Sequence, residues 1–260
     1  MKFFDSHAHY NDALFGERFP GGADGAIALS REAGCAGILN AGTSPETSRE
    51  CIALAGRYDF FYAAAGIHPY DCAFLEGNLN DSLDEIRALC AHPKVRAIGE
   101  IGLDYHYEGI DRELQKRYFT AQLELARELD MPVIIHDREA HGDVYAILRS
   151  FPDVKAVLHS FSGSAEDARQ LCRGGRYISF SGTVTYKNAR NVHEAAAAVC
   201  DELLLVETDA PYLPPVPHRG KINLSAYIPF TVSALASVRS RSEEDIAELT
   251  LKNAEAFFGL

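Results

Sequence analysis

The sequence predicts an α/β fold, a single TIM (β/α)8 barrel that spans residues 1–260 and carries its active site at the C-terminal ends of the strands. Its 260 residues are close to the usual length of such a barrel. Eight short apolar runs alternate with segments of helical spacing, which is typical of parallel strands joined by helical crossovers. Polar residues gather where the apolar runs end, and in a TIM barrel this edge of the strands holds the active site.

The eight predicted strands are short and mostly apolar. Runs such as VIIH and LLLVE lack the polar alternation of half-exposed strands, as expected for parallel strands that are buried on both faces. An open, doubly wound sheet is the alternative, because a sequence does not show whether a sheet closes. The predicted strands cover Lys2–His9, Ala36–Gly42, Phe60–His68, Val95–Gly102, Met131–His136, Val154–His159, Tyr177–Gly182 and Leu203–Asp209.

Helical spacing is clearest over Asp111–Leu129, where apolar side chains recur along one face. Asp111 and Ser242 stand where N-cap residues are expected, each just before a helical pattern. That face consists of Leu114, Tyr118, Ala121, Leu125 and Leu129. The other predicted helices cover Pro45–Gly56, Leu83–Cys90, Asp143–Ser150, Ala165–Cys172, Ala189–Val199 and Glu243–Phe257.

Composition excludes several classes of protein. A net charge of −12 argues against a long basic groove on duplex nucleic acid, although bound metal ions can supply positive charge locally. The N-terminus lacks the apolar run of a signal peptide, and no stretch reaches the roughly 18 apolar residues of a membrane span. We therefore expect a cytoplasmic protein, a monomer by default, without membrane contact. The six cysteines form no CxxC pair and are expected to stay reduced.

Histidine side chains mark the ends of the predicted strands. Because residues two apart on a strand face the same way, His7 and His9 can bind one ion together. His136, His159 and Asp209 each close a different strand, and a barrel brings those ends together around one axis. Imidazole and carboxylate groups suit Zn²⁺, Mn²⁺ and related ions. Any one of these residues alone would indicate a structural role, but together they predict a metal site.

Glu100, in the run GEIGLD, extends this prediction to two metal ions. A carboxylate has two oxygens, and dinuclear hydrolases hold their metals roughly 3.5–4 Å apart, a span that one carboxylate can bridge. A salt-bridge role is the alternative, although a buried carboxylate needs compensating charge. We expect two divalent ions, Mg²⁺, Mn²⁺ or Zn²⁺. The predicted ligands are His7, His9 and Asp209 for one ion, His136 and His159 for the other, and Glu100 for both.

Six motifs in order, FDSHAHY, GIHP, GEIGLDY, IIHDR, LHSFSG and TDAPYLPPVPHRGK, resemble the TatD family of metal-dependent deoxyribonucleases in the amidohydrolase superfamily. The resemblance runs from Phe4 to about Tyr227. It implies a TIM barrel, divalent metals and hydrolysis of phosphodiester bonds in single-stranded DNA from the 3′ end. The family's metal ligands fall on the same six residues, with Glu100 where related superfamily members carry a modified lysine.

Two departures from the family pattern concern the substrate. The family often has HPH after the third strand, whereas this chain has Tyr70 in place of the second histidine. The loop after the last strand often continues HRGKRNEP, whereas here Ile222, Leu224 and Ser225 replace the charged residues and the proline. Both changes are expected to lie where substrate touches, so they concern substrate preference and leave the metal chemistry intact.

A metal-activated water is the expected nucleophile. Metals lower the pKa of bound water, and Asp209 and Glu100 are the predicted catalytic carboxylates, with Asp209 as general base. Asp5 and Glu207 lie two residues before metal ligands, on the same strand faces, and are expected to orient them. Asp104 is expected to do the same.

Substrate contacts are predicted in two places. His218, Arg219 and Lys221 form a short basic cluster beyond Asp209, and an arginine can grip phosphate through two parallel hydrogen bonds. Ordinary solvated charge is the alternative for this cluster. His68 is expected to contact substrate or leaving group, with a core histidine as the alternative.

Two other functions stay open from the sequence. One is an amidohydrolase-type enzyme that acts on a small-molecule amide, lactone or phosphoester, because one fold supports many reactions. The other is a non-catalytic binding protein on a barrel scaffold. The sequence does not choose the native metal, nor DNA over RNA.

Overall fold

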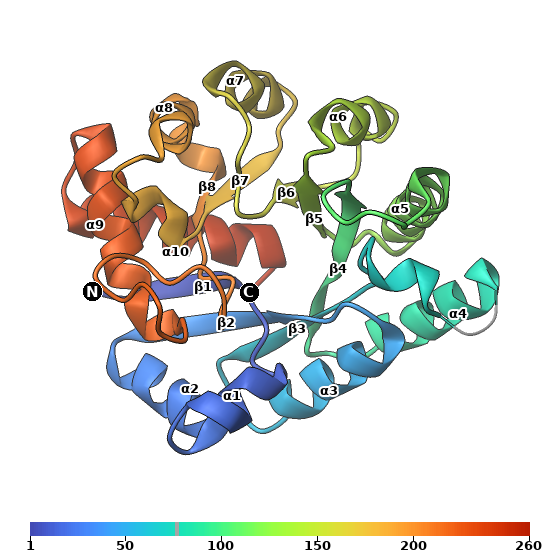
Figure 1. Cartoon of the computed structure of the whole chain (residues 1–260), viewed down its shortest axis with the longest axis horizontal. Helices are drawn as coiled ribbons and strands as arrows, with labels where there is room; N and C mark the ends of the chain where they lie inside the picture. The colour runs from blue at the N-terminus through green and yellow to red at the C-terminus, as the bar shows by residue number, and fades with distance from the viewer. Residues whose placement is uncertain (76–77) are drawn as a thin grey trace. The chain divides into compact units, whose positions relative to one another are not determined.

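Eight strands alternate with helices along the chain, and the eight-stranded sheet has the order β1 to β8 (Figure 1). The computed structural model describes residues 1–75 and 78–260. The chain divides into two units, Met1–Asn40 with His159–Leu260, and Ala41–Leu158. Sequential strand order with parallel pairing and helical connections is the topology of a TIM barrel, so the predicted fold class is confirmed.

The first unit contains both the first and the last strand. β1 (Phe3–Ala8) pairs in parallel with β2 (Cys35–Ala41), and β7 (Tyr177–Phe180) pairs in parallel with β8 (Leu204–Val206). The amide of Asp209 donates to the carbonyl of His7 at 2.9 Å, and the amide of His9 donates to the carbonyl of Ala210 at 2.7 Å. The chain just beyond β8 therefore continues alongside β1, which places the two ends of the strand sequence next to each other.

Helices flank the strands of the first unit, and α10 packs against both β1 and β8. Its N-cap is Ser242, as predicted, and its hydroxyl accepts from the amide of Asp245. The helices of this unit are α1 (Ala13–Arg18), α2 (Gly22–Glu32), α7 (Ala165–Arg173), α8 (Arg190–Ala198), α9 (Ile228–Arg239) and α10 (Glu243–Phe258), with short 3-10 turns η2 (Gly182–Thr185), η3 (Asp201–Leu203) and η4 (Ser225–Tyr227).

The described residues of the second unit form a parallel sheet of β3 to β6 with four helices and one 3-10 turn. β4 pairs with β3 on one side and β5 on the other, and β5 pairs with β6. The strands are β3 (Phe61–Ala65), β4 (Val95–Asp104), β5 (Val133–Arg138) and β6 (Ala156–Leu158). The helices are α3 (Pro45–Ala55), α4 (Leu79–Cys90), α5 (Arg112–Leu129) and α6 (His141–Arg149), and the turn is η1 (Asp71–Ala73).

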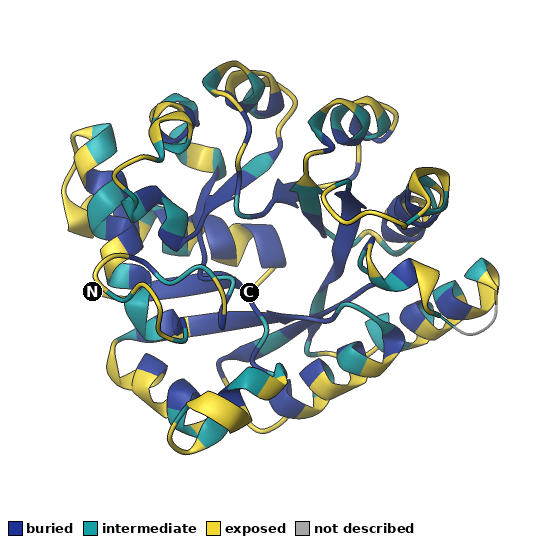
Figure 2. Cartoon of the chain, in the orientation of Figure 1, coloured by how far each residue is buried: buried dark blue, intermediate teal, exposed yellow. Residues whose placement is uncertain are grey.

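Buried residues fill the strands and line one face of each long helix (Figure 2). In α5 the side chain of Asp111 accepts from the amide of Glu113, so the predicted N-cap is confirmed. The buried stripe of this helix differs from the predicted face, because it includes Phe119 and two glutamines, Gln115 and Gln122. Gln115 binds the backbone at the end of β4, and Gln122 binds the backbone of Ile67, just beyond β3, so polar side chains occupy positions that the apolar pattern leaves out.

Three helices were absent from the sequence predictions. α2 contains two glycines, and Gly21 and Gly34 flank it with positive φ angles, so its helical pattern is weak. α9 is mostly apolar, begins with a proline in its first turn and has no acidic residue there, and α1 has only six residues. The predicted start of α4 at Leu83 is four residues late, because Asn78 caps it. In the described part of the chain, no helix is both long enough and apolar enough to span a membrane.

Candidate metal-binding site

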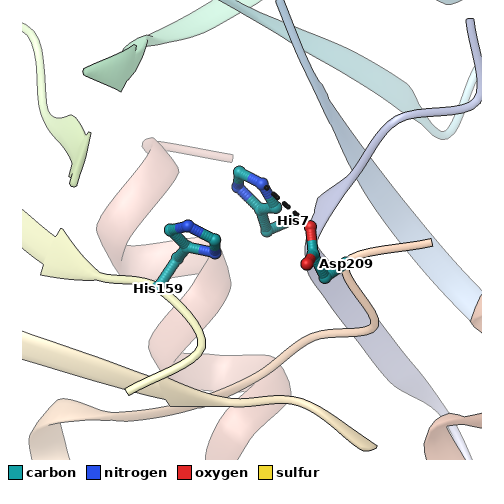
Figure 3. A group of neighbouring side chains, drawn as sticks. All are labelled: His7, His159 and Asp209. Carbon is teal, nitrogen blue, oxygen red and sulfur yellow. Dashed lines mark ion pairs between the residues drawn. The ribbon is translucent and has the colours of Figure 1, made fainter. Parts of the chain in front are cut away.

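In the first unit, His7, His9 and Asp209 converge as predicted. His7 lies within β1 and His9 directly after it, and their Nε2 atoms are 3.0 Å apart. Asp209 Oδ1 lies 3.7 Å from Nε2 of His7 (Figure 3). The same oxygen lies 3.4 Å from Nε2 of His9. The residue spacing of two on an extended chain therefore turns both imidazoles toward one carboxylate.

His159 joins these three residues to form what we call the histidine–aspartate cluster. Its ring stacks on that of His7, with centroids 4.1 Å apart and an angle of 19° between planes (Figure 3). Its Nδ1 lies 3.4 Å from Oε1 of Glu207, whose other oxygen accepts a short hydrogen bond from the Ser179 hydroxyl. A carboxylate at Nδ1 can orient the ring so that Nε2 faces a metal ion. From the sequence we expect Glu207 beside Asp209, which follows it by two residues, whereas its carboxylate lies beside the His159 ring.

The Asp209 carboxylate is held in its ionised form. Burial by itself would raise its pKa, but a hydrogen bond from His9 and the charges of His159, His7 and His9 outweigh burial and lower the pKa below its ordinary value. The residue also has a positive φ of 59°, a conformation that few non-glycine residues adopt. Ionised carboxylate oxygen beside imidazole nitrogen is a suitable donor set for a divalent ion.

Asp5 is buried beneath this cluster, and its partners are backbone and hydroxyl groups. Its carboxylate accepts from the hydroxyl of Thr208 at 2.6 Å, from the amide of Thr208 at 3.0 Å and from the amide of His7 at 3.3 Å. The Ser225 hydroxyl donates to it as well, at 2.6 Å. Burial raises the pKa of Asp5 to about 7, although these hydrogen bonds lower it. Asp5 therefore positions the backbone on both sides of the cluster and does not bind the His7 imidazole.

In the second unit, Glu100, His136, Asp104 and His68 form what we call the glutamate cluster. His136 Nδ1 lies 2.6 Å from Glu100 Oε1, and its Nε2 lies 3.0 Å from Asp104 Oδ2. His68 Nε2 lies 3.6 Å from the same Glu100 oxygen. Glu100 lies inside β4, which extends two residues beyond its predicted end at Gly102, to Asp104, and Ile101 and Gly102 pair with β5.

Asp104 contacts a predicted metal ligand directly. Burial alone would raise its pKa, but the hydrogen bond and charge of His136, together with the charge of His68, lower it. In the structure it therefore stands as a candidate ligand beside Glu100, or as the group that orients the His136 ring.

Two glutamines missing from the predictions fix the backbone of this cluster. Gln122 accepts from the amide of Ile67 at 2.7 Å and donates to its carbonyl at 3.0 Å, directly before His68. Gln115 binds the amide and carbonyl of Asp104 in the same way, both at 2.8 Å. Both glutamines come from α5, and no periodic sequence signal marks a buried glutamine as a positioning residue.

The three residues of the predicted basic cluster have different surroundings. His218 stacks on Tyr227 with centroids 3.8 Å apart, and burial, followed by the charge of Lys221, lowers its pKa. The exposed Arg219 lies with its guanidinium 4.6 Å from the centroid of the Tyr186 ring. Lys221 is exposed. His218 is thus a packed ring, whereas Arg219 and Lys221 keep their charges available to solvent.

The altered loop after Lys221 lies mostly inside the protein. Leu224 and Ser225 are buried, at 2% and 0% exposure, so the expectation that they touch substrate is wrong. Leu224 packs in the core, and Ser225 joins the hydrogen bonds of Asp5 and Tyr10. Tyr70, in contrast, is 40% exposed and available to a substrate.

Each cluster offers donor atoms suited to a divalent metal ion. The ligand atoms of His7, His159 and Asp209 all lie within 4.8 Å of one another, and the same holds for His68, Glu100 and His136. Imidazole nitrogen and carboxylate oxygen are the donors that Zn²⁺ and Mn²⁺ accept. The sharing of Glu100 between two ions, and a joint ion for His136 and His159, stay predictions.

Comparison with known proteins gives consistent results. The model of the family described as TatD related DNase matches residues 4–259. An uncharacterized metal-dependent hydrolase, YabD of Bacillus subtilis, is 37% identical over 257 residues, which cover 98% of each chain. A protein of Citrobacter rodentium named 3'-5' ssDNA/RNA exonuclease TatD is 35% identical over 244 residues, covering 91% of this chain and 92% of its own. The crystal structure of the TatD homologue YjjV of Escherichia coli superimposes with a TM-score of 0.90 at 31% identity, covering 99% and 98% of the two chains.

Proposed function

Because the chain belongs to the TatD family and is a metal-dependent hydrolase, we propose that it cleaves phosphodiester bonds of single-stranded DNA from the 3′ end. The convergence of His7, His9 and Asp209 carries this proposal, since one carboxylate oxygen lies within 3.7 Å of both imidazole nitrogens. The exonuclease name of the Citrobacter rodentium relative supports the choice of substrate and direction.

We infer that the two clusters hold divalent metal ions. His7, His9 and Asp209 would hold one ion together with His159, in place of the predicted pairing of His159 with His136, and Glu100 with His136 would hold another. Bound ions of this kind lower the pKa of water and neutralise charge that develops on phosphoryl oxygens. Glu207 and Asp104 would keep the histidine rings aligned, because each places a carboxylate beside a ring nitrogen.

Asp209 is the proposed general base. Its lowered pKa keeps it ionised at neutral pH, so an oxygen is available to accept a proton from the attacking water. Arg219 and Lys221 are the proposed phosphate contacts, because their charged groups are exposed in the loop that follows Asp209. Glu100 is the second proposed catalytic carboxylate.

The test is cleavage of single-stranded DNA that carries a label at either the 3′ or the 5′ end. The protein is incubated with Mg²⁺, Mn²⁺, Zn²⁺ or a chelator, and Asp209→Asn controls for contaminating nucleases. Stepwise loss from the 3′ end, abolished by the chelator and by the variant, is the expected result. Absence of cleavage with every metal would overturn the proposal and direct attention to small-molecule esters, amides and phosphoesters.

A further inference from the structure

Three exposed aromatic side chains of the second unit gather in one place. Tyr70, Phe74 and Tyr107 are 40%, 64% and 47% exposed. Among the described residues of this unit, they are the large apolar side chains that lie exposed. The ring of Tyr70 lies 5.2 Å from that of Phe74 and 5.2 Å from that of Tyr107. Apolar groups that cluster on a surface in this way indicate a binding site more than chance exposure does.

The cluster follows directly from the residues of the glutamate cluster. Tyr70 comes two residues after His68, and its amide donates to His68 Nδ1 at 3.1 Å. Tyr107 comes three residues after Asp104, and its ring lies 5.4 Å from the guanidinium of Arg138, which comes two residues after His136. Three chain segments therefore each carry a candidate metal-site residue and, two or three residues later, a side chain that belongs to this surface or contacts it.

The geometry of the rings suits flat ligands. The planes of Tyr70 and Phe74 make an angle of 45°, and those of Tyr70 and Tyr107 make an angle of 64°, so the rings do not cover one another face to face. Because the three side chains are 40%, 64% and 47% exposed, part of each remains open to a further aromatic group. Arg138 adds a cation beside Tyr107, and guanidinium groups also stack on bases.

The negative net charge of the chain bears on which ligand this aromatic surface can bind. A chain with a net charge of −12 gains little affinity for a polyanion from general electrostatic attraction. Stacking of bases on aromatic rings supplies affinity without neutralising phosphates, and it is available to single strands, whose bases are exposed. This argument rests on the proposed nuclease function.

We propose that Tyr70, Phe74 and Tyr107, with Arg138, form a stacking surface for the bases of a single-stranded nucleic acid whose phosphodiester lies at the glutamate cluster. The surface binds bases of any sequence, since every base offers a flat face.

The test compares Tyr70→Ala, Phe74→Ala and their combination with the unaltered protein. Binding of fluorescent single-stranded DNA is measured in chelator, without turnover, and KM and kcat are measured with metal. We expect Kd and KM to rise about 5- to 150-fold for each lost base contact, with kcat little changed. Tyr70→Phe should bind normally, as should Leu29→Ala, which removes a similarly exposed side chain, 44% exposed, from α2.

A substrate without bases isolates the stacking contribution. An oligonucleotide with abasic sites next to its 3′ end keeps every phosphate, so the protein and its alanine variants should cleave it with the same raised KM. Activity of the variants on this substrate also shows that they fold. The loss of affinity should be equal at 50 and 200 mM salt, because no phosphate contact is removed.

Several outcomes would overturn the stacking surface. Equal KM for the normal and abasic substrates in the unaltered protein would do so while leaving the nuclease intact. Binding of DNA that depends on Tyr70 and Phe74, without cleavage under any metal, would keep the stacking surface and remove the proposed function. A change from dimer to monomer in the variants, with unaltered KM, would identify the patch as a subunit contact instead.

Discussion

The Ser225 hydroxyl donates a 2.6 Å hydrogen bond to the Asp5 carboxylate, which lies 220 residues earlier in the chain. Asp5 belongs to β1, and Ser225 begins the short turn η4. The same carboxylate binds the amides of His7 and Thr208, the residue before Asp209. A single buried acid therefore connects the two chain segments that carry the histidine–aspartate cluster to the loop that follows it.

Replacement of Ser225 tests this connection. Ser225→Ala removes one donor from a buried acceptor, so we expect the free energy of unfolding to fall by about 1–3 kcal/mol. Urea denaturation followed by circular dichroism measures the change. Ser237→Ala, at an exposed position of α9, is the matched control and should be nearly neutral. Equal stability of the two variants would show that Asp5 is satisfied by its other donors.

Glu207 offers a test of metal affinity. Glu207→Gln keeps the size of the side chain but weakens its hold on Nδ1 of His159, so metal affinity should fall about 10- to 100-fold. Titration with Mn²⁺ or Zn²⁺, followed by the rise in Tm, reports this change because a metal that binds the folded state stabilises it. Glu202→Gln, on an exposed residue of η3, should behave like the unaltered protein. An unchanged titration would show that Glu207 does not contribute to metal affinity through His159.

Arg219 is expected to contribute to binding of the phosphodiester. Its guanidinium lies over the ring of Tyr186, which holds it in one region while its charge stays exposed. Arg219→Ala should raise KM about tenfold, since it removes a hydrogen bond to a charged group. Arg173→Ala removes the same charge from an exposed site on α7 and serves as the control. The same KM in both variants would mean that only net charge matters.

Asp201 predicts an acid-dependent loss of stability. Asp201 forms ion pairs with Arg239 and Arg241. Burial alone would raise the pKa of its carboxyl, but the two arginines outweigh burial and lower the pKa below its ordinary value of 3.8. A carboxyl whose pKa is lower in the folded state stabilises that state above its unfolded pKa, and this contribution is lost as the pH falls through the folded value. Because the side chain is 41% exposed, solvent screens the pair, and we expect about 1 kcal/mol.

Thermal unfolding of Asp201→Asn between pH 7 and pH 3 measures this contribution. The variant should be less stable at pH 7, and the difference from the unaltered protein should begin to shrink below about pH 4, as the pH falls toward the lowered pKa of the folded state. A difference that stays constant over this range would assign the effect to packing.

The sequence predicts the strands well because parallel, buried strands leave continuous apolar runs. All eight strands occur near their predicted positions, and polar residues such as His7 and Asp209 stand within them or just beyond their ends. The sequence did not predict α2 and α9, because helical periodicity is weak where glycines interrupt a helix or where most residues, on every face, are apolar. In those segments, tertiary packing decides the structure.

In the candidate site, too, local sequence spacing predicts some contacts and tertiary packing decides others. His7 and His9 could be paired from their spacing alone, since the geometry of an extended chain fixes it. The position of His159 on the ring of His7 depends on contacts between distant segments, which no local pattern records. Ser225 looked like a surface departure from a family motif, and only its burial beside Asp5 shows that it is structural.

The two buried glutamines of α5 fix the spacing of two chain segments. Gln115 and Gln122 are seven residues apart, about two helical turns or roughly 10 Å. Gln122 binds the backbone just beyond β3, and Gln115 binds the backbone at the end of β4. The distance between the segment that carries His68 and the segment that carries Asp104 is therefore set by the spacing of these two residues along the helix. A helix resists stretching far more than a loop does, so the two segments are spaced by an element that takes no part in the chemistry.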